Sequence, residues 1–278
     1  MVPESPTRTT AYPHVSMSTS PATLATYRLP APTFHPEHIS STMRPLWKAM
    51  ANNRWRDARE ELPTASAATE GDQAALFAAR AIIERALGNG TATQRWLSRS
   101  LDIVPEQWLA LRLKCDILAR RQQFEAAYDL LASQDADAPA HGGWDIPLSI
   151  ADYHTALASW AFRQNDRPLA ISHLKSAYPK LVEMPRTLLQ DLFRLSVNTM
   201  DKQTARDSAA ALISILPYAA ADGVLQALVD RGWEEDALSL YLSLDDSDAP
   251  ADALRRRIVG LCLRTGAVDQ ARQYHTSI

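Results

Sequence analysis

Four short segments contain residue types that bind ligands or catalyse reactions in other proteins. The glycines of LGNGT, residues 87–91, could cradle a phosphate, although no lysine follows them. HPEH, residues 35–38, places two imidazoles three residues apart, a spacing that could bind a metal. DDSDAP, residues 245–250, could attract a cation, and His154 and His173 fall on adjacent helices of one predicted hairpin.

Each segment also has a simpler structural interpretation, which we favour. The glycines suit a turn, the HPEH imidazoles lie in a segment expected to be disordered, and the acidic residues suit the cap of a following helix. His154 and His173 suit a surface or a groove. The nucleophile-elbow, zinc-protease, P-loop and dinucleotide-binding motifs do not occur in the sequence. We therefore predict no catalytic residue, no metal site and no cofactor, and expect that the protein is not an enzyme.

The composition predicts an all-α protein. The chain has 278 residues, of which 46% are hydrophobic, enough to build a sizeable core. Alanine and leucine dominate, and alternating runs of valine, isoleucine or threonine are scarce, which favours helix over sheet. The net charge is −3 and the pI about 6.2, with no dense basic run. Nucleic acid is therefore disfavoured as a general ligand.

Cysteine use and hydropathy indicate the compartment. Cys115 and Cys262 lie in apolar helical patterns far apart in sequence, so we expect small buried thiols in a reducing compartment, without a disulfide or redox pair. No apolar run approaches the roughly 20 residues that span a bilayer, and the start of the chain lacks a basic segment followed by an apolar core. We expect a cytoplasmic protein. The excess of arginine over lysine hints at GC-rich coding and a bacterial source.

Residues 1–39 differ from the rest of the chain. They hold seven of the seventeen prolines and many hydroxyl residues. Proline blocks helix interiors, and the scattered apolar residues cannot offset the entropy cost of ordering. We predict a disordered or polyproline-like arm. The same composition resembles a targeting segment, although its prolines would break the amphipathic helix that such a segment needs.

The remainder of the chain predicts pairs of helices joined by short polar turns. Prolines 105, 147, 185, 217 and 250 fall between the pairs, where they start or follow helices. The predicted hairpins are 42–66, 72–103, 106–133, 148–183, 185–216, 219–245 and 250–276.

A small residue recurs about five positions beyond each turn. These residues are Ala58, Thr93, Ala127, Ala170, Ala205, Ala237 and Ala271, at steps of 35, 34, 43, 35, 32 and 34. A small side chain lets the second helix of a hairpin approach the first, so a constant phase indicates a repeat.

This pattern resembles the tetratricopeptide repeat family, whose repeat is about 34 residues long. The unit around Leu157, Ala170 and Pro179 matches best. The second unit is degenerate, because Arg80 or Glu84 would fall at core positions unless the register slips. The resemblance covers residues 42–276 and implies a right-handed α-solenoid of about seven hairpins. Hairpins 1–3 would occupy 40–134, an inserted loop 135–147, and hairpins 4–7 148–278.

The inserted segment carries one large apolar residue, Trp144, beside two glycines. Such a residue on a flexible loop could contact a partner. The alternatives are a solvated connector or a side chain that fills the gap between the two groups of hairpins.

The resemblance also implies a concave groove lined by the first helices of the hairpins. Carried onto this sequence, its positions include Asp152, and Arg112, Arg120, Arg163 and Arg194 would hold an acidic or C-terminal peptide. The alternative is a solvated face paired with its own aspartates. Trp47 and Met50 could receive an apolar anchor or the N-terminal arm, or could serve the core. The groove set is Arg112, Asp116, Arg120, Thr155, Ser159, Phe162, Arg163, Gln190, Arg194, Asn198, Arg256 and Arg264.

A protein-binding role follows from this resemblance. We expect a non-enzymatic adaptor or scaffold that binds a segment of a partner protein, possible roles being bacterial assembly, secretion or regulation. A structural subunit of a larger complex is the first alternative. A helical-repeat RNA-binding protein is the second, although no regular pair of base-reading residues is evident.

Overall fold

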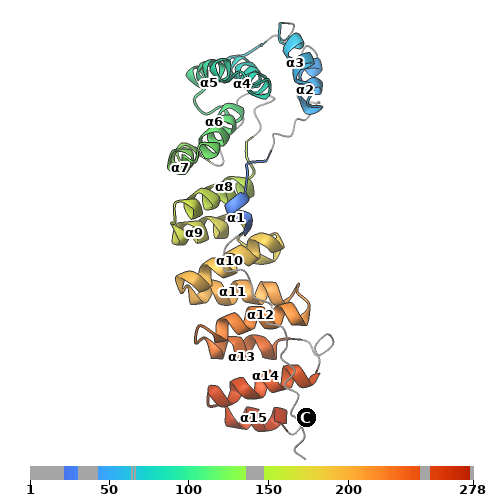
Figure 1. Ribbon diagram of the computed structural model, residues 1–278, viewed down its shortest axis with the longest axis vertical. Helices are drawn as coiled ribbons and strands as arrows, with labels where there is room; N and C mark the ends of the chain where they lie inside the picture. Colours follow the sequence, from blue (N-terminus) through green and yellow to red (C-terminus); the bar gives the residue numbers. More distant parts are fainter. Residues whose placement is uncertain are drawn as a thin grey trace, which may run out of the picture. The chain divides into compact units, whose positions relative to one another are not determined.

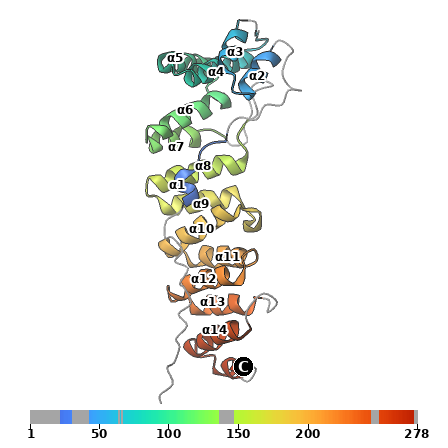
Figure 2. The ribbon, with the colours of Figure 1, turned by 45° about the vertical axis from the view of Figure 1, so that its right-hand side comes forward.

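A computed structural model describes residues 22–30, 43–63, 65, 67–135, 147–244 and 251–275. All regular structure in these residues is helical, which confirms the all-α class (Figures 1 and 2). From Thr23 onward the chain divides into two compact units, Thr23–Pro179 and Lys180–Ile278, and each is described by itself. Among the described residues, no helix combines the length and apolar character that crossing a bilayer requires.

The first unit contains a short helix followed by four helix pairs, and each helix from α2 onward packs against the next. The pairs agree with the hairpin ranges expected from the sequence, except that α4 begins slightly earlier. The helices are α1 (Ala22–Thr26), α2 (Arg44–Ala51), α3 (Trp55–Glu61), α4 (Glu70–Ala86), α5 (Gly90–Ile103), α6 (Trp108–Arg120), α7 (Phe124–Ala132), α8 (Ile150–Arg163) and α9 (Arg167–Ala177).

The second unit begins with a 3-10 turn, η2 (Leu181–Glu183), and continues as three helix pairs whose successive members also pack together. Only α12 begins a residue before its expected hairpin. The helices are α10 (Arg186–Thr199), α11 (Lys202–Ile213), α12 (Tyr218–Val229), α13 (Glu234–Leu242), α14 (Ala251–Arg264) and α15 (Val268–His275).

One residue with positive φ closes every hairpin. The following N–H bonds to the carbonyl five residues earlier, for example Arg54 to Ala49 at 2.8 Å and Asp166 to Ala161 at 2.9 Å. This left-handed residue and long hydrogen bond form the Schellman motif, which satisfies carbonyls at a helix end. The left-handed residues are Asn53, Gly88, Gln122, Asn165, Met200, Gly232 and Gly266.

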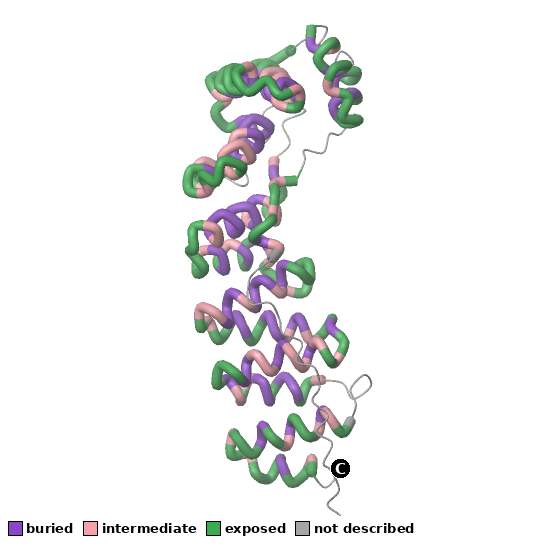
Figure 3. The backbone as a smooth tube through the Cα atoms, viewed as in Figure 1, coloured by how far each residue is buried: buried purple, intermediate pink, exposed green. Residues whose placement is uncertain are grey.

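The small residues found in the sequence lie five positions beyond these turns, and all of them are buried. Ala127 shows the reason: its carbonyl lies 3.8 Å from the Cys115 sulfur on the first helix of the same pair. A larger side chain at such a position would push the two helices apart. Figure 3 shows that buried residues lie on facing sides of paired helices.

In several turns, one residue both completes the Schellman motif and caps the next helix. The Asp166 side chain accepts from the Leu169 N–H at 3.0 Å, and Asn89 accepts in the same way from Ala92 at 3.3 Å. Because a carboxylate or amide oxygen satisfies an orphan N–H of the new helix, the chain reverses within a few residues.

The core of the first unit settles two sequence expectations. Trp47 and Met50 are 3% and 4% exposed and belong to its hydrophobic core, so they serve packing. Glu84 does occupy a core position, at 3% exposure, without a slip of register. Its carboxylate accepts from Arg59 at 3.2 Å and from Asn89 at 3.0 Å, and these bonds offset the cost of burying its charge.

The left-handed turns predict a gain in stability at Gln122. This exposed residue has φ 62°, a conformation that costs a residue with a Cβ about 1 kcal/mol relative to glycine. We expect Gln122→Gly to raise the free energy of unfolding by about 0.5–1 kcal/mol, measured by urea denaturation.

Gln122→Ala is the matched control, because it removes the same amide but retains the Cβ and therefore the strain. An equal gain in both variants would show that the side chain, and not the backbone conformation, sets the stability of this turn.

Candidate functional site

Three polar side chains form a stripe along α8. Asp152, Ser159 and Arg163 are separated by seven and four residues, so they lie on one face of the helix. Asp152 stands in the first turn, where Ser149 caps the helix by accepting from the Asp152 N–H at 3.1 Å. The Ser149 hydroxyl also donates to the Asp152 carboxylate at 2.6 Å, which orients the side chain at the Asp152 end of the stripe.

Residues of the chain's own N-terminal region lie on this stripe. The Ser159 hydroxyl donates to the Leu24 carbonyl at 2.7 Å, and Arg163 donates through Nη2 to the Ala25 carbonyl. The Tyr27 hydroxyl donates to the Asp152 carboxylate at 3.1 Å. Helix α1 accordingly lies beside α8 in both ribbon views (Figures 1 and 2). We call residues 23–29 the docked segment.

The docked segment departs from the disordered arm expected over residues 1–39. Leu24 is 0% exposed, and Tyr27 and Leu29 pack against the apolar cluster of α6, α7 and α8. Burial of these side chains supplies the free energy that the average composition of the arm lacks. The rest of that arm, at 1–21 and 31–39, lies outside the described residues.

Charge and burial shape both ends of this contact. Burial, followed by the neighbouring Asp152 carboxylate, raises the pKa of Tyr27, so its hydroxyl remains a donor. The Arg163 guanidinium lies 4.6 Å from the centre of the Phe124 ring. Its burial, and then the positive charge of Arg28, lower the pKa of Arg163. The docked segment thus brings one positive charge close enough to Arg163 to affect its pKa.

The other groove candidates of the first unit fall into two groups. Thr155 is buried on α8, Phe162 is half-buried, and Arg112 is 9% exposed on α6, where its charge acts on Tyr27. Asp116 and Arg120 instead belong to an internal ion-pair network.

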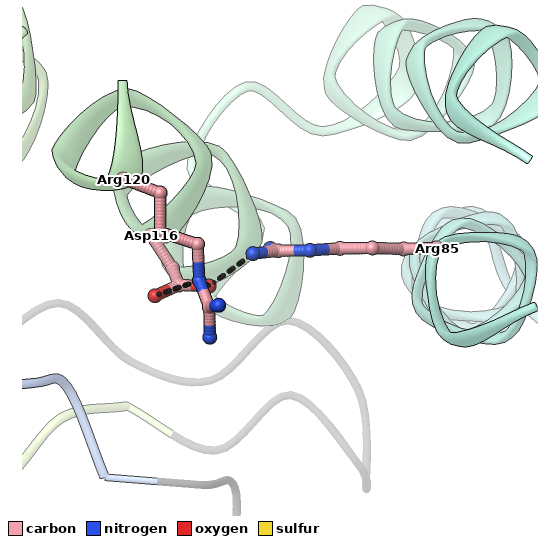
Figure 4. A network of polar contacts seen from close by, with 3 residues as sticks. All are labelled: Arg85, Asp116 and Arg120. Carbon is pink, nitrogen blue, oxygen red and sulfur yellow. Dashed lines mark hydrogen bonds and ion pairs between the residues drawn. The ribbon is translucent and has the colours of Figure 1, made fainter. Parts of the chain in front are cut away.

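That network joins two hairpins (Figure 4). Arg85 on α4 donates to Asp116 on α6 at 2.5 Å, and Arg120 contacts the same carboxylate at 3.1 Å. Because Arg120 is 60% exposed, its pair contributes little to stability. Asp116 and Arg120 therefore match the alternative of a solvated face whose arginines pair with its own aspartates, and not an open binding face.

Most groove candidates of the second unit are engaged with neighbouring side chains. Arg194 lies 3.6 Å from Asp191, and Arg264 lies 2.6 Å from Glu234. Asn198 accepts from another arginine, Arg231, at 3.3 Å. Gln190 is half-buried and Arg256 is exposed, while Trp144 lies outside the described residues. The candidates do not form one described site, since they divide between the two units.

The sequence interpretation missed Arg257, which links two hairpins of the second unit. It donates to Gln226 at 3.1 Å and to Asp222 at 3.2 Å, and Asp222 also accepts from Tyr241 at 2.6 Å. Arg257 stands 35 residues after Asp222. A search for opposite charges one repeat apart would have found this pair.

His154 and His173 stack on adjacent helices, with their Nδ1 atoms 3.2 Å apart. At that distance one nitrogen donates and the other accepts, which requires the accepting ring to be neutral. The other nitrogen of His173 bonds with the Tyr128 hydroxyl at 2.9 Å. Across the described ranges, no three histidine, cysteine or acidic side chains gather as a metal site would need.

The histidine pair predicts a loss of stability in acid. Burial, and then His154, lower the pKa of His173 from 6.5 to about 4. The unfolded chain therefore binds more protons between these values, and stability falls as the pH drops from about 6.5 to about 4. We expect His173→Gln to flatten this dependence of the urea midpoint, measured between pH 7 and pH 4.5.

His275→Gln is the matched control, because His275 is exposed near the end of α15. An acid dependence that is the same in wild type and His173→Gln would contradict the role given to the pair.

Comparison of the chain with models of known protein families gives no match, and comparison with curated proteins gives none either.

Proposed function

We propose that this protein is a non-enzymatic adaptor that binds a segment of a partner protein on the Asp152–Ser159–Arg163 stripe of α8. In this proposal the hairpins form a right-handed solenoid of the tetratricopeptide type, whose first helices carry the binding face. Support for the repeat comes from the seven left-handed turns, each followed five residues later by a buried small residue.

The single observation that carries the binding function is the docked segment. Ser159 and Arg163 contact main-chain carbonyls of Leu24 and Ala25, which every polypeptide possesses. Donors aimed at carbonyls hold a peptide without reading its side chains, while neighbouring apolar surface supplies selectivity. This stripe therefore has the chemistry of a peptide-binding face.

A site-specific crosslink tests this function. Phe162 is half-buried and adjoins Arg163, so a benzophenone amino acid at this position replaces one aromatic group with another beside the stripe. In the native cell, illumination should join it to a partner protein. Without a partner, it should join only the docked segment.

The same crosslinker at Gln94, an exposed residue of α5, is the control. A partner adduct of similar yield at both positions, or only at Gln94, would refute binding on the α8 stripe.

A further inference from the structure

The docked segment shows which kind of helix end the α8 stripe accommodates. The last carbonyls of any α-helix lack partners within the helix. In α1, the Thr26 hydroxyl donates to the Thr23 carbonyl at 3.4 Å, and Ser159 and Arg163 bind the next two carbonyls. The stripe thus caps the C-terminal end of a short helix, where a cation is also favoured by the helix dipole.

Two side chains of the docked segment determine its fit. Leu24 is fully buried, whereas Ala25 and Thr26 are exposed. Tyr27, three residues after Leu24, packs on the α6–α8 cluster and reaches Asp152 with its hydroxyl. Helix α1 ends at Thr26, so the spacing Leu-x-x-Tyr spans the helix end, with Tyr27 directly after the last helical residue. The two intervening side chains carry little information for recognition.

Several features make this contact reversible. Helix α1 has five residues, fewer than an isolated helix needs to be stable in water. Its partners on α8 lie 125 to 138 residues away in sequence, so no hairpin turn holds it in place. The positive charge of Arg28, after burial, lowers the pKa of Arg163.

We propose that the Asp152–Ser159–Arg163 stripe selects a partner segment in which a short helix ends with the sequence Leu-x-x-Tyr, and that Leu24–Tyr27 occupies the stripe until such a segment displaces it. This inference rests on the proposed adaptor function. It adds the class of ligand and an internal competitor that sets the apparent affinity.

The docked segment itself supplies the probe. A fluorescent peptide with the sequence of residues 20–31, SPATLATYRLPA, is titrated against the full chain and against full-chain Leu24→Asp, which should release the segment. The tethered copy competes at a high effective concentration. We therefore expect the peptide to bind Leu24→Asp at least tenfold more tightly than wild type.

Matched changes test the chemistry. Gln94→Asp adds the same charge to an exposed position of α5 and should leave the peptide affinity close to that of wild type. In the Leu24→Asp chain, Ser159→Ala should weaken peptide binding about fivefold, and a Tyr→Phe peptide should bind about fivefold more weakly because it cannot donate to Asp152.

Three outcomes would overturn the proposal. The first is a folded Leu24→Asp chain that does not bind the peptide, or binds equally well a peptide with aspartate in place of leucine. The second is equal protection of residues 22–29 and α8 in hydrogen exchange of the wild type, which would mark a permanent element. That measurement decides the question even if Leu24→Asp does not fold. The third is a wild-type dimer that Leu24→Asp makes monomeric, which would assign the segment to exchange between two copies.

Failure of this inference is distinguishable from failure of the adaptor function. A partner crosslink at Phe162 together with no peptide binding would keep the binding face and reject the Leu-x-x-Tyr ligand. Absence of both would reject the adaptor as well.

Discussion

Closure of each hairpin rests on one backbone conformation, the left-handed residue between its two helices. At Asn165, for example, the positive φ lets the N–H of Asp166 reach back to Ala161 while the Asp166 side chain opens the next helix. The reversal then brings Ala170, fully buried, against the preceding helix. Since the left-handed residue, the long hydrogen bond and the buried small residue recur in every turn, local hydrogen bonding sets the phase of successive hairpins.

Contacts between hairpins add a second level of order to this local closure. Arg85 binds Asp116, and Arg257 binds Asp222, in both cases across roughly one repeat of sequence. Both pairs are partly exposed, so apolar burial stabilises the contacts between hairpins and the charged pairs help to select which surfaces meet. Of the arginines expected to face a ligand, Arg264 instead faces Glu234 of the neighbouring hairpin. Arg120 and Arg194 pair within their own helices.

The sequence predicts the hairpins well because their determinants are local. The residues that start, reverse and pack each helix pair lie within a few positions of one another, so their spacing is visible without a structure. The docking of α1 was missed because Leu24 meets Ser159 across 135 residues. Its signal was a short apolar spacing, Leu24 and Tyr27, enclosed by Pro21 and Pro30, which the composition of the surrounding arm obscured.

Local closure also has a consequence for how such a chain can grow. Between Gln122 and Asn165 the step is 43 residues where its neighbours are 34 and 35, yet both turns keep the same geometry and the same buried alanine five residues later. Because each hairpin contains the turn residues that close it, the chain tolerates extra residues before or after a hairpin. Duplication or loss of a whole hairpin would therefore disturb the fold little, because the turns of the neighbouring hairpins would keep their geometry.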